Sequence, residues 1–541
     1  MNFLRNRRPS SIFWPLALFG LVASVGFTKI SNFDIWWHLK TGEIINLTGS
    51  IPRFDIFSYT AAGQPWMNHE WLFQLFTWNC YQLFGNTSLI MIKLLLTSII
   101  AISIFKTTQL LTKSNSAALW GTLLVLAAIA DRVMMRPFLF TLMFLPYFIL
   151  QLHRYEKDDK RNLWELPFLT LIWINLHAGG LLAPPLVFAF ALGETIQAAF
   201  SKRLGDEVPK AINTKRIYHL WVVGFLCTIA CMITPYGIET LTFPLSHLGM
   251  GSILQYTQEW LPFLDPRLDG IISQILARTL LALLLISYFI NRKSVRISHL
   301  LLTIITALML LKGKRFTSHF VIANLPILFF NLKILARRIP ITPGAGYLHS
   351  WGNLIVVGML SLLALRHGVP STIGGDLAGS PGLGSVHIVK PAAVDMLDKY
   401  DIHGKVFNEL GVGSYFLFKR WPRDKVFIDG RTPVYGDTFF LDYIDALRHP
   451  KNFETLDKKY NFDYLVFNSY QAWPLRHMHR YFWYNPDWKL IFANQDGIIY
   501  LRNTPKHHDL IEKLELKIHP LIEEMKRKGE IGTQKITDIK K

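Results

Sequence analysis

Apolar runs near the length needed to cross about 30 Å of hydrocarbon recur along the first two thirds of the chain. We count about eleven, of which the third, ninth and tenth are short or closely spaced. This pattern predicts an α-helical polytopic membrane domain over residues 1–366, with about 11 transmembrane helices. The predicted spans are 12–29, 87–105, 117–131, 137–152, 162–177, 180–200, 217–235, 271–290, 298–311, 316–332 and 350–366.

Lys and Arg residues are unevenly divided between alternate loops. With the N-terminus in the cytoplasm, the cytoplasmic loops hold about 20 of them and the opposite loops about nine. Since all of the cytoplasmic loops share this bias, we expect a multi-pass protein of the cell inner (plasma) membrane. An odd number of spans then places the C-terminal part outside the cytoplasm.

Composition supports a membrane protein. Only 18% of the 541 residues are charged and 51% are hydrophobic, whereas soluble proteins have roughly 25% charged residues. The net charge of +19 is spread between apolar stretches rather than gathered on one basic face. That distribution argues against a nucleic-acid partner. Three Cys residues imply no disulfide framework.

The composition changes after the last predicted span. Residues 367–390 are rich in Gly, Pro and Ser and predict a flexible linker. Residues 391–503 alternate between strand-like and helix-like patterns, which predicts a small α/β extracytoplasmic domain. Residues 504–541 carry charges of both signs and predict a helical tail. The predicted strands are 405–408, 425–428, 462–468, 489–494 and 498–502, and the predicted helices are 391–400, 413–418, 437–448 and 450–460.

The long first outer loop, residues 30–86, holds the most informative polar side chains. Apolar residues between positions 36 and 47 predict an amphipathic helix in the membrane interface. Asp34, at its start, is either an N-cap or a catalytic or substrate-binding carboxylate, and we favour the second. His38 lies on the same predicted helix. His69 and Glu70 either cap the next helix or face the same cleft, and the pattern does not decide between these.

Two other outer segments carry candidate residues. Asp131, Arg132 and Arg136 lie in a short hairpin, where arginines either snorkel beside a surface ion pair or contact a phosphate. Asn175 and His177 end a span beside two glycines. They are either packing polar groups or part of a site at the outer mouth.

A basic group follows the ninth predicted span. Lys312, Lys314 and Arg315 lie on the side that should be poor in cations. An anionic lipid head or a leaving phosphate would account for them. Glu259, in another outer loop, we expect to be exposed rather than functional.

In the soluble part, Asp429 and Arg431 follow a predicted strand end, a frequent ligand position in α/β folds. As a bare tripeptide with Gly430, the signal is weak.

Several short stretches resemble the GT-C superfamily of polytopic glycosyltransferases. They are FDIWWHLKTG at 33–42, GQPWMNHEWL at 63–72, NLH at 175–177 and PYG at 235–237. Members closest in style are the protein O-mannosyltransferases of glycosyltransferase family 39 and the lipid A aminoarabinose transferases. The resemblance covers most of the chain by architecture.

The resemblance implies roles for particular residues. Asp34 matches the first-loop catalytic acid of that superfamily. Where those families usually show an Asp-Glu pair, this chain has Asp34-Ile35, and the prolines expected near His69 and Glu70 are absent. Whether one or two acids act, and whether a divalent cation is bound, therefore stays open. No metal ligand is assigned.

The implied activity is transfer of a hexose or pentose from a polyprenyl-phosphate-linked donor to an envelope lipid, glycan or protein. Nucleotide sugars are not expected outside the cell, so an outward-facing transferase needs a lipid-phosphate sugar. Asp34 would act as general base, and Arg132, Arg136 and Arg315 would contact the phosphate. The other predicted partners are the acceptor and membrane lipid, and Asp429 and Arg431 would close over the acceptor.

Two other classes of protein remain open. One is a multi-span transporter or flippase, against which the chain shows no clear internal repeat. The other is a non-catalytic assembly protein for envelope polysaccharide, which would tolerate loss of Asp34.

Overall fold

The chain forms two compact units in a computed structural model. Unit 1 comprises Met1–Arg53 and Trp66–Val386, and unit 2 comprises Phe54–Pro65 and His387–Lys541. Most of the predicted span 350–366, most of the linker and the tail beyond residue 517 lie outside the described residues. The structure describes residues 13–204, 210–246, 251, 258–336, 352–353, 355, 357–360, 380–386, 389–469 and 475–517.

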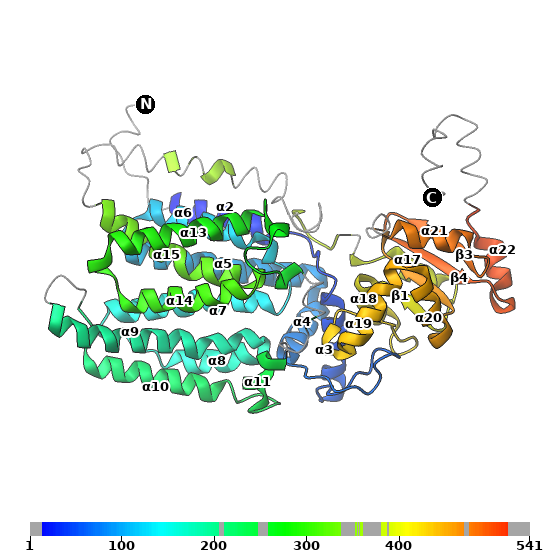
Figure 1. Cartoon of the computed structure of the whole chain (residues 1–541), viewed down its shortest axis with the longest axis horizontal. Helices are drawn as coiled ribbons and strands as arrows, with labels where there is room; N and C mark the ends of the chain where they lie inside the picture. Colours follow the sequence, from blue (N-terminus) through cyan, green and yellow to red (C-terminus); the bar gives the residue numbers. More distant parts are fainter. Residues whose placement is uncertain are drawn as a thin grey trace. The chain divides into compact units, whose positions relative to one another are not determined.

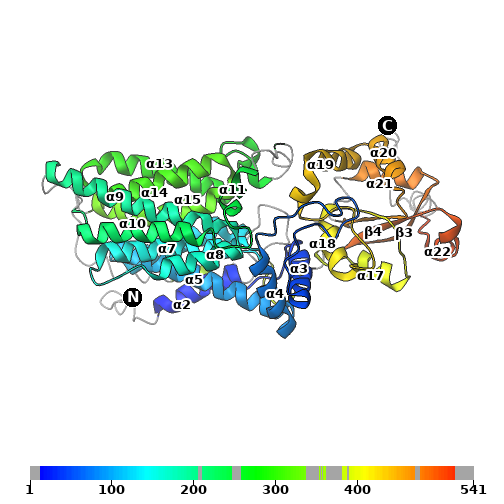
Figure 2. The same cartoon turned by 90° about the horizontal axis from the view of Figure 1, so that it is seen from below.

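Unit 1 is built from helices, which confirms the predicted helical class. Helices α5 and α7 pack side by side, as do α9 and α10 (Figures 1 and 2). The helices are α2 (Phe13–Gly26), α3 (Ile35–Thr48), α4 (Trp71–Phe84), α5 (Asn86–Thr112), α6 (Asn115–Ile129), α7 (Phe138–Lys157), α8 (Glu165–Leu176), α9 (Ala183–Leu204), α10 (Thr214–Ala230), α11 (Glu239–Ser246), α13 (Ile272–Ile290), α14 (Ile297–Lys312) and α15 (Thr317–Ala336).

Fewer helices than expected are long and apolar enough to cross a membrane. Among the described residues, four segments meet that standard: Asn86–Thr112, Ala178–Phe200, Ile272–Ile290 and Lys314–Ala336. Shorter apolar helices are Phe13–Gly26, Glu165–Leu176 and Ile297–Lys312. The predicted count of eleven is therefore wrong for the part of the chain described, because several apolar runs form helices of only 12–17 residues. The four long apolar segments and the shorter apolar helices are together consistent with a membrane protein.

Helix α3 buries most of its residues inside unit 1, and its predicted position in the membrane interface stays a prediction. Trp36 and Leu39 are fully buried, and so is the polar His38, whereas Leu47 is 76% exposed. Helix α4 packs closely against it at Gly42, where a Cβ would lie 2.1 Å from the backbone oxygen of Gln74. The apolar residues of α3 thus pack inside unit 1, because α4 covers them.

Unit 2 holds a four-stranded sheet with the order β1-β2-β4-β3, which confirms a small sheet in the C-terminal region. β1 (Val406–Asn408) pairs parallel to β2 (Tyr464–Phe467). β4 (Gly497–Arg502) pairs antiparallel to both β2 and β3 (Trp488–Asn494), and β3 and β4 form the predicted hairpin. The helices are α17 (Ala392–Lys399), α18 (Leu410–Arg420), α19 (Thr432–Arg448), α20 (Pro450–Tyr460), α21 (Arg476–Tyr484) and α22 (His508–Leu514).

The predicted strand 425–428 does not join this sheet. Val426 instead forms an isolated parallel bridge with Ser58, from the first-loop segment 54–65 that belongs to unit 2. The Thr60 hydroxyl donates to the Phe427 carbonyl at 2.6 Å, and the Trp421 indole donates to the Ile56 carbonyl at 3.0 Å. The backbone of Val426 and the Phe427 carbonyl therefore pair with a segment from far earlier in the chain, while the Asn408 side chain binds the Phe427 amide and the Ile428 carbonyl.

Candidate active site

Asp34 meets Arg136 at the N-terminal end of α7. The Asp34 carboxylate lies 2.6 Å from an Arg136 terminal nitrogen, and the Asn32 side-chain oxygen accepts from both the Asp34 backbone and Arg136 Nε. The Asp34 side chain makes no capping hydrogen bond to α3. The capping interpretation of Asp34 is therefore wrong, and the carboxylate is ion-paired and 26% exposed.

Glu259 is the centre of an arginine cluster, which we define as Arg132, Arg136, Arg315, Glu259 and Asp34. One Glu259 oxygen accepts from Arg132 at 2.5 Å and from Arg136 at 3.3 Å. Burial alone would raise the pKa of Glu259, but the three nearby guanidinium groups lower it well below its usual range. Its carboxylate is thus held ionised, which corrects the expectation that Glu259 is an exposed loop residue without a role.

The arginines of the cluster are fixed by aromatic rings as well as by acids. The Arg132 guanidinium lies 4.5 Å from the centre of the Phe138 ring, and the Arg315 guanidinium lies 4.3 Å from that of Trp260. Such cation–π contacts hold a charge in place without neutralising it. Arg132 thus pairs with Glu259 and contacts a ring, and Arg136 pairs with Asp34 and Glu259, whereas their position relative to the membrane stays a prediction.

Glu70 adds a second carboxyl group beside the arginine cluster. Burial and the neighbouring Asp34 raise the pKa of Glu70 to about 8, against the opposing effect of Arg136 and Arg315. Its side chain makes no capping bond to α4, and it lies 3.6 Å from the His69 ring. Glu70 is therefore mostly protonated at neutral pH and capable of donating a hydrogen bond.

His38 and His177 are buried close to the same cluster. Burial lowers the pKa of both, and Arg136 lowers that of His38 further, while His69 and Arg315 lower that of His177. The His177 Nδ1 accepts from the Gly179 backbone at 2.9 Å and lies 2.8 Å from the Thr141 hydroxyl. A Cβ on Gly179 would lie 2.0 Å from that hydroxyl, so this loop requires glycine. Both imidazoles are thus neutral, polar walls of the site.

An apolar cavity of about 310 Å³ lies beside Asn175. Its lining includes Trp71, Leu72 and Ile172, and the Asn175 amide bridges α4 and the turn after α10. The amide accepts from the Trp71 indole at 2.9 Å and donates to the Ile233 carbonyl at 3.0 Å. Asn175 therefore holds one wall of the cavity, which supports the packing interpretation of this residue.

The balance of charge in the arginine cluster favours an anion. Three guanidinium groups face the carboxyl groups of Asp34 and Glu259, while Glu70 is mostly neutral. The five side chains of the cluster thus have a formal charge of +1. Side-chain exposures of 26–35% for Asp34, Glu259 and Arg136 leave it open to a ligand.

Asp429 and Arg431 are not part of this arrangement. Both are buried in unit 2, where Arg431 pairs with Asp429 at 2.7 Å and with Asp55 at 2.6 Å. The Tyr435 hydroxyl also donates to Asp429 at 2.8 Å. These ion pairs connect Arg431 to segment 54–65, and a contact of Asp429 and Arg431 with the acceptor stays a prediction.

The described residues bring together one group of side chains with metal-ligand spacing, and it does not include the first-loop acids. The group is His153, Glu156 and His299. Asp34, by contrast, already faces a guanidinium. The sequence signal that would have found the group is a His and a Glu three residues apart at the end of an apolar run.

The fold is similar to that of solved structures of an archaeal oligosaccharyltransferase. The apo crystal structure of an oligosaccharyltransferase from Archaeoglobus fulgidus aligns with a TM-score of 0.51 and 13% identity, covering 92% of this chain and 75% of that one. The oligosaccharyltransferase AglB of the same organism, in complex with an inhibitory peptide and a dolichol-phosphate, aligns with a TM-score of 0.52 and 11% identity. The alignment covers 91% of this chain and 74% of that one. The crystal structure of ArnT from Cupriavidus metallidurans, bound to undecaprenyl phosphate, aligns with a TM-score of 0.44 and 11% identity. The alignment covers 90% of this chain and 97% of that one.

The fold of the two archaeal structures confirms the resemblance to the GT-C superfamily at the level of architecture. No protein-family model matches the sequence, and no curated protein matches it.

Proposed function

We propose that this protein is a membrane glycosyltransferase that moves a sugar from a polyprenyl-phosphate donor to an envelope acceptor on the outer face of the membrane. The AglB structure with the same fold contains a dolichol-phosphate, which supports a lipid-phosphate donor. The observation that carries the proposal is the Asp34–Arg136 pair inside a partly exposed cluster with one excess positive charge. A carboxylate and phosphate-binding cations are the two groups that this transfer requires.

The reaction forms one bond and breaks one bond at the anomeric carbon. An acceptor hydroxyl or amine attacks that carbon, and the bond from the carbon to the phosphate oxygen breaks. The bonding electrons leave with the polyprenyl phosphate, and the acceptor proton passes to Asp34 as general base. Arg132, Arg136 and Arg315 stabilise the charge that grows on the phosphate.

Glu259 marks the place of the phosphate. Its carboxylate contacts two of the guanidinium groups that we assign to the donor. Guanidinium binds carboxylate and phosphate through the same fork of N–H donors, so the two anions compete for one position. We therefore infer that donor binding displaces Glu259 from Arg132 and Arg136.

The apolar cavity beside Asn175 provides a place for the first isoprene units of the donor. It lies on α4 and α8, and α4 begins directly after Glu70. The Asn175 amide closes its polar side, as the hydrogen bonds to Trp71 and Ile233 show. His38, His69 and His177 would then lie on the sugar side as neutral polar walls.

The test is comparative mass spectrometry of envelope lipids, glycans and glycoproteins. The strains are a deletion, the wild type, and an Asp34→Asn variant with normal membrane levels. A sugar-sized mass lost in both the deletion and the variant would support the transferase and name its acceptor. A mass lost only in the deletion would remove Asp34 from the mechanism and favour an assembly protein or a transporter.

A further inference from the structure

A second polar cluster lies at the other end of α7, where no part of the proposed reaction takes place. His153 and Glu156 belong to the last turns of α7, and His299 belongs to the first turn of α14. Helix α7 begins two residues after Arg136, and the 15 residues from Phe138 to His153 span about 22 Å of helix. This cluster is therefore separate from the arginine cluster, and its role does not depend on the proposed function.

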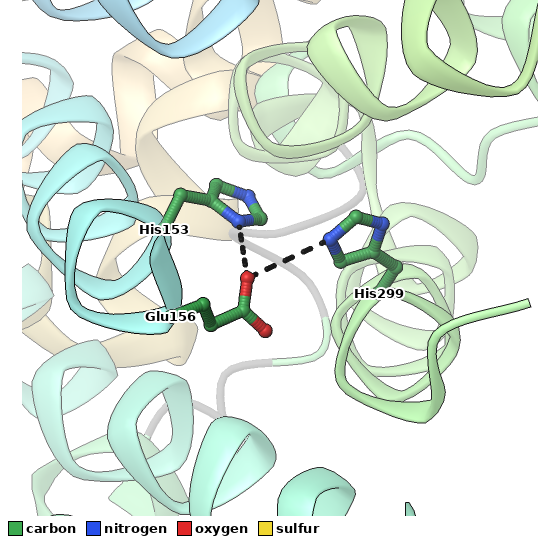
Figure 3. A group of neighbouring side chains, drawn as sticks. All are labelled: His153, Glu156 and His299. Carbon is green, nitrogen blue, oxygen red and sulfur yellow. Dashed lines mark hydrogen bonds and ion pairs between the residues drawn. The ribbon is translucent and has the colours of Figure 1, made fainter. Parts of the chain in front are cut away.

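The three side chains point toward one another in a sealed interior (Figure 3). His153 and Glu156 have side-chain exposures of 0% and 1%, and His299 is also 1% exposed. Phe190 packs edge-on against the His153 ring, and Phe330 packs edge-on against the His299 ring. One ligand atom of each of the three residues lies within 4.8 Å of the other two.

The two oxygens of Glu156 have different neighbours. Oε1 accepts from the Ser298 hydroxyl at 2.9 Å and lies 3.6 Å from Arg296 Nε. Oε2 lies 3.0 Å from His153 Nδ1 and 4.0 Å from His299 Nε2. Oε2 is therefore available as a ligand while Ser298 orients the carboxylate, as hydrogen-bonding partners of metal ligands commonly do.

The His299 ring gives a second, independent indication. Its Nε2 is buried and has no hydrogen-bond partner among the described residues, although it faces Oε2. A gap of 4.0 Å is too long for a hydrogen bond. In a tetrahedral zinc site with bonds of about 2.0–2.1 Å, two ligand atoms lie about 3.3 Å apart. The observed separations of 3.0 and 4.0 Å lie on either side of that value.

Two cations flank the buried carboxylates of Glu156 and Glu194. Arg296 lies 3.6 Å from Glu156 and pairs with Glu194 at 2.9 Å. Lys157 also lies close enough to interact with both carboxylates. Neutral imidazoles and a carboxylate are the ligands that a divalent transition metal takes.

We propose that His153, Glu156 and His299 bind one Zn²⁺ ion that ties the end of α7 to the start of α14. Two imidazole nitrogens and one carboxylate oxygen supply three ligands, and a water molecule completes the tetrahedron. An ion that binds only the folded state stabilises that state, so this site would stabilise the junction of α7 and α14.

The first experiment measures metal in the full-length protein, purified in detergent with its affinity tag removed. The protein is stripped with chelator, and Zn²⁺ or spectroscopically visible Co²⁺ is added back. We expect one ion per chain, tetrahedral Co²⁺ absorption bands, and a higher unfolding temperature with metal. His299→Gln and His153→Gln should lower the metal content to background.

His219→Gln is the matched control. His219 stacks on Tyr155 of α7 but lies outside the cluster, so its loss should leave the metal content unchanged. Equal metal in the wild type and in a folded His299→Gln variant would overturn the proposal. The proposal would also be overturned if the wild-type protein bound no more metal than a variant with both His153→Gln and His299→Gln.

A second measurement uses the unmodified protein in case the variants fail to fold. Zinc-edge X-ray absorption should show a first shell of about four nitrogen and oxygen neighbours at about 2.0–2.1 Å, with imidazole scattering. A shell containing sulfur would instead assign the ion to Cys227 and Cys231 and would overturn the site.

Discussion

Helix α7 carries a charged cluster at each end, and the two clusters differ in exposure and in charge balance. At its N-terminal end, Asp34, Arg136 and Glu259 are 26–35% exposed, and the cluster has one cation in excess. At its C-terminal end, His153 and Glu156 are 0–1% exposed, and Arg296 and Lys157 balance the buried carboxylates of Glu156 and Glu194.

The difference separates two uses of buried charge. In a partly exposed cluster, an incoming anion can replace an internal carboxylate at little cost, because surface pairs contribute only about 0–1 kcal/mol. In a sealed cluster, removing one partner leaves an unbalanced charge, which costs about 3–5 kcal/mol. Function is therefore expected at the first end and stability at the second.

The largest effect on stability is expected from Glu156→Gln. The substitution removes the carboxylate that faces His153, His299 and Arg296, so the unfolding free energy should fall by about 3–5 kcal/mol. Thermal unfolding in detergent measures the change. Ser298→Ala, which removes one hydrogen bond to the same carboxylate, should cost only about 1 kcal/mol. Equal stability of wild type and Glu156→Gln would show that the sealed end does not depend on its charges.

Arg136→Gln should give the largest loss of activity with little loss of stability. Arg136 contacts Asp34, Asn32 and Glu259, and removal of one preorganised donor of this kind costs about 10²–10³ in kcat. The assay follows the envelope product identified in the deletion strain. The matched control is Arg278→Gln, since Arg278 also pairs with an acid in a loop but lies outside the cluster. An active Arg136→Gln enzyme would contradict the phosphate assignment.

Glu259→Gln should strengthen donor binding, whereas Arg136→Gln should reduce activity. If Glu259 holds the place of the donor phosphate, its neutral amide will compete less well for Arg132 and Arg136. We expect polyprenyl phosphate to bind about 3–10-fold more tightly, a gain of roughly 1 kcal/mol. Native mass spectrometry of the detergent-solubilised protein measures this affinity. Weaker binding would show that Glu259 supports the site rather than competing with its ligand.

A change in the pH dependence of stability is expected at Glu70. Its pKa is raised from 4.5 to about 8 in the folded protein, so folding takes up a proton between those values. The unfolding free energy should therefore fall as the pH rises from about 4.5 to about 8. Glu70→Gln should flatten the unfolding temperature between pH 5.5 and 8.5. Glu43→Gln, on α3, should leave the slope as in the wild type, and an unchanged slope in Glu70→Gln would contradict the assignment.

Much of the fold could be predicted from local patterns. Apolar runs located most helices of unit 1, and the Asp496-Gly497 turn located the β3–β4 hairpin. Local sequence patterns gave a wrong or incomplete prediction where an element packs or pairs with another segment of the chain. Helix α3 looks amphipathic in sequence, yet α4 covers it, and residues 425–428 look like a sheet strand, yet they pair with the segment around Ser58.

The candidate site was predicted in part. Asp34, Arg132, Arg136 and Arg315 were singled out, and the structure places them together, while the catalytic role of Asp34 stays a prediction. Glu259 was missed because its partners lie 123 and 127 residues earlier in the chain, and a lone acid in a loop gives no local signal. Asp429 and Arg431 resemble a ligand site in sequence, because the ion pair between Arg431 and the distant Asp55 gives no local signal.

The first-loop segment 54–65 has a consequence for biosynthesis. Thr60 and Phe427, which share a hydrogen bond, are 367 residues apart in sequence. At a translation rate of about 5–20 residues per second, roughly 20–70 s pass between the synthesis of the two. During that interval Asp55 has left the ribosome, but its guanidinium partner has not yet been made. Segment 54–65 can therefore reach its place in unit 2 only after Arg431 and Phe427 have been synthesised.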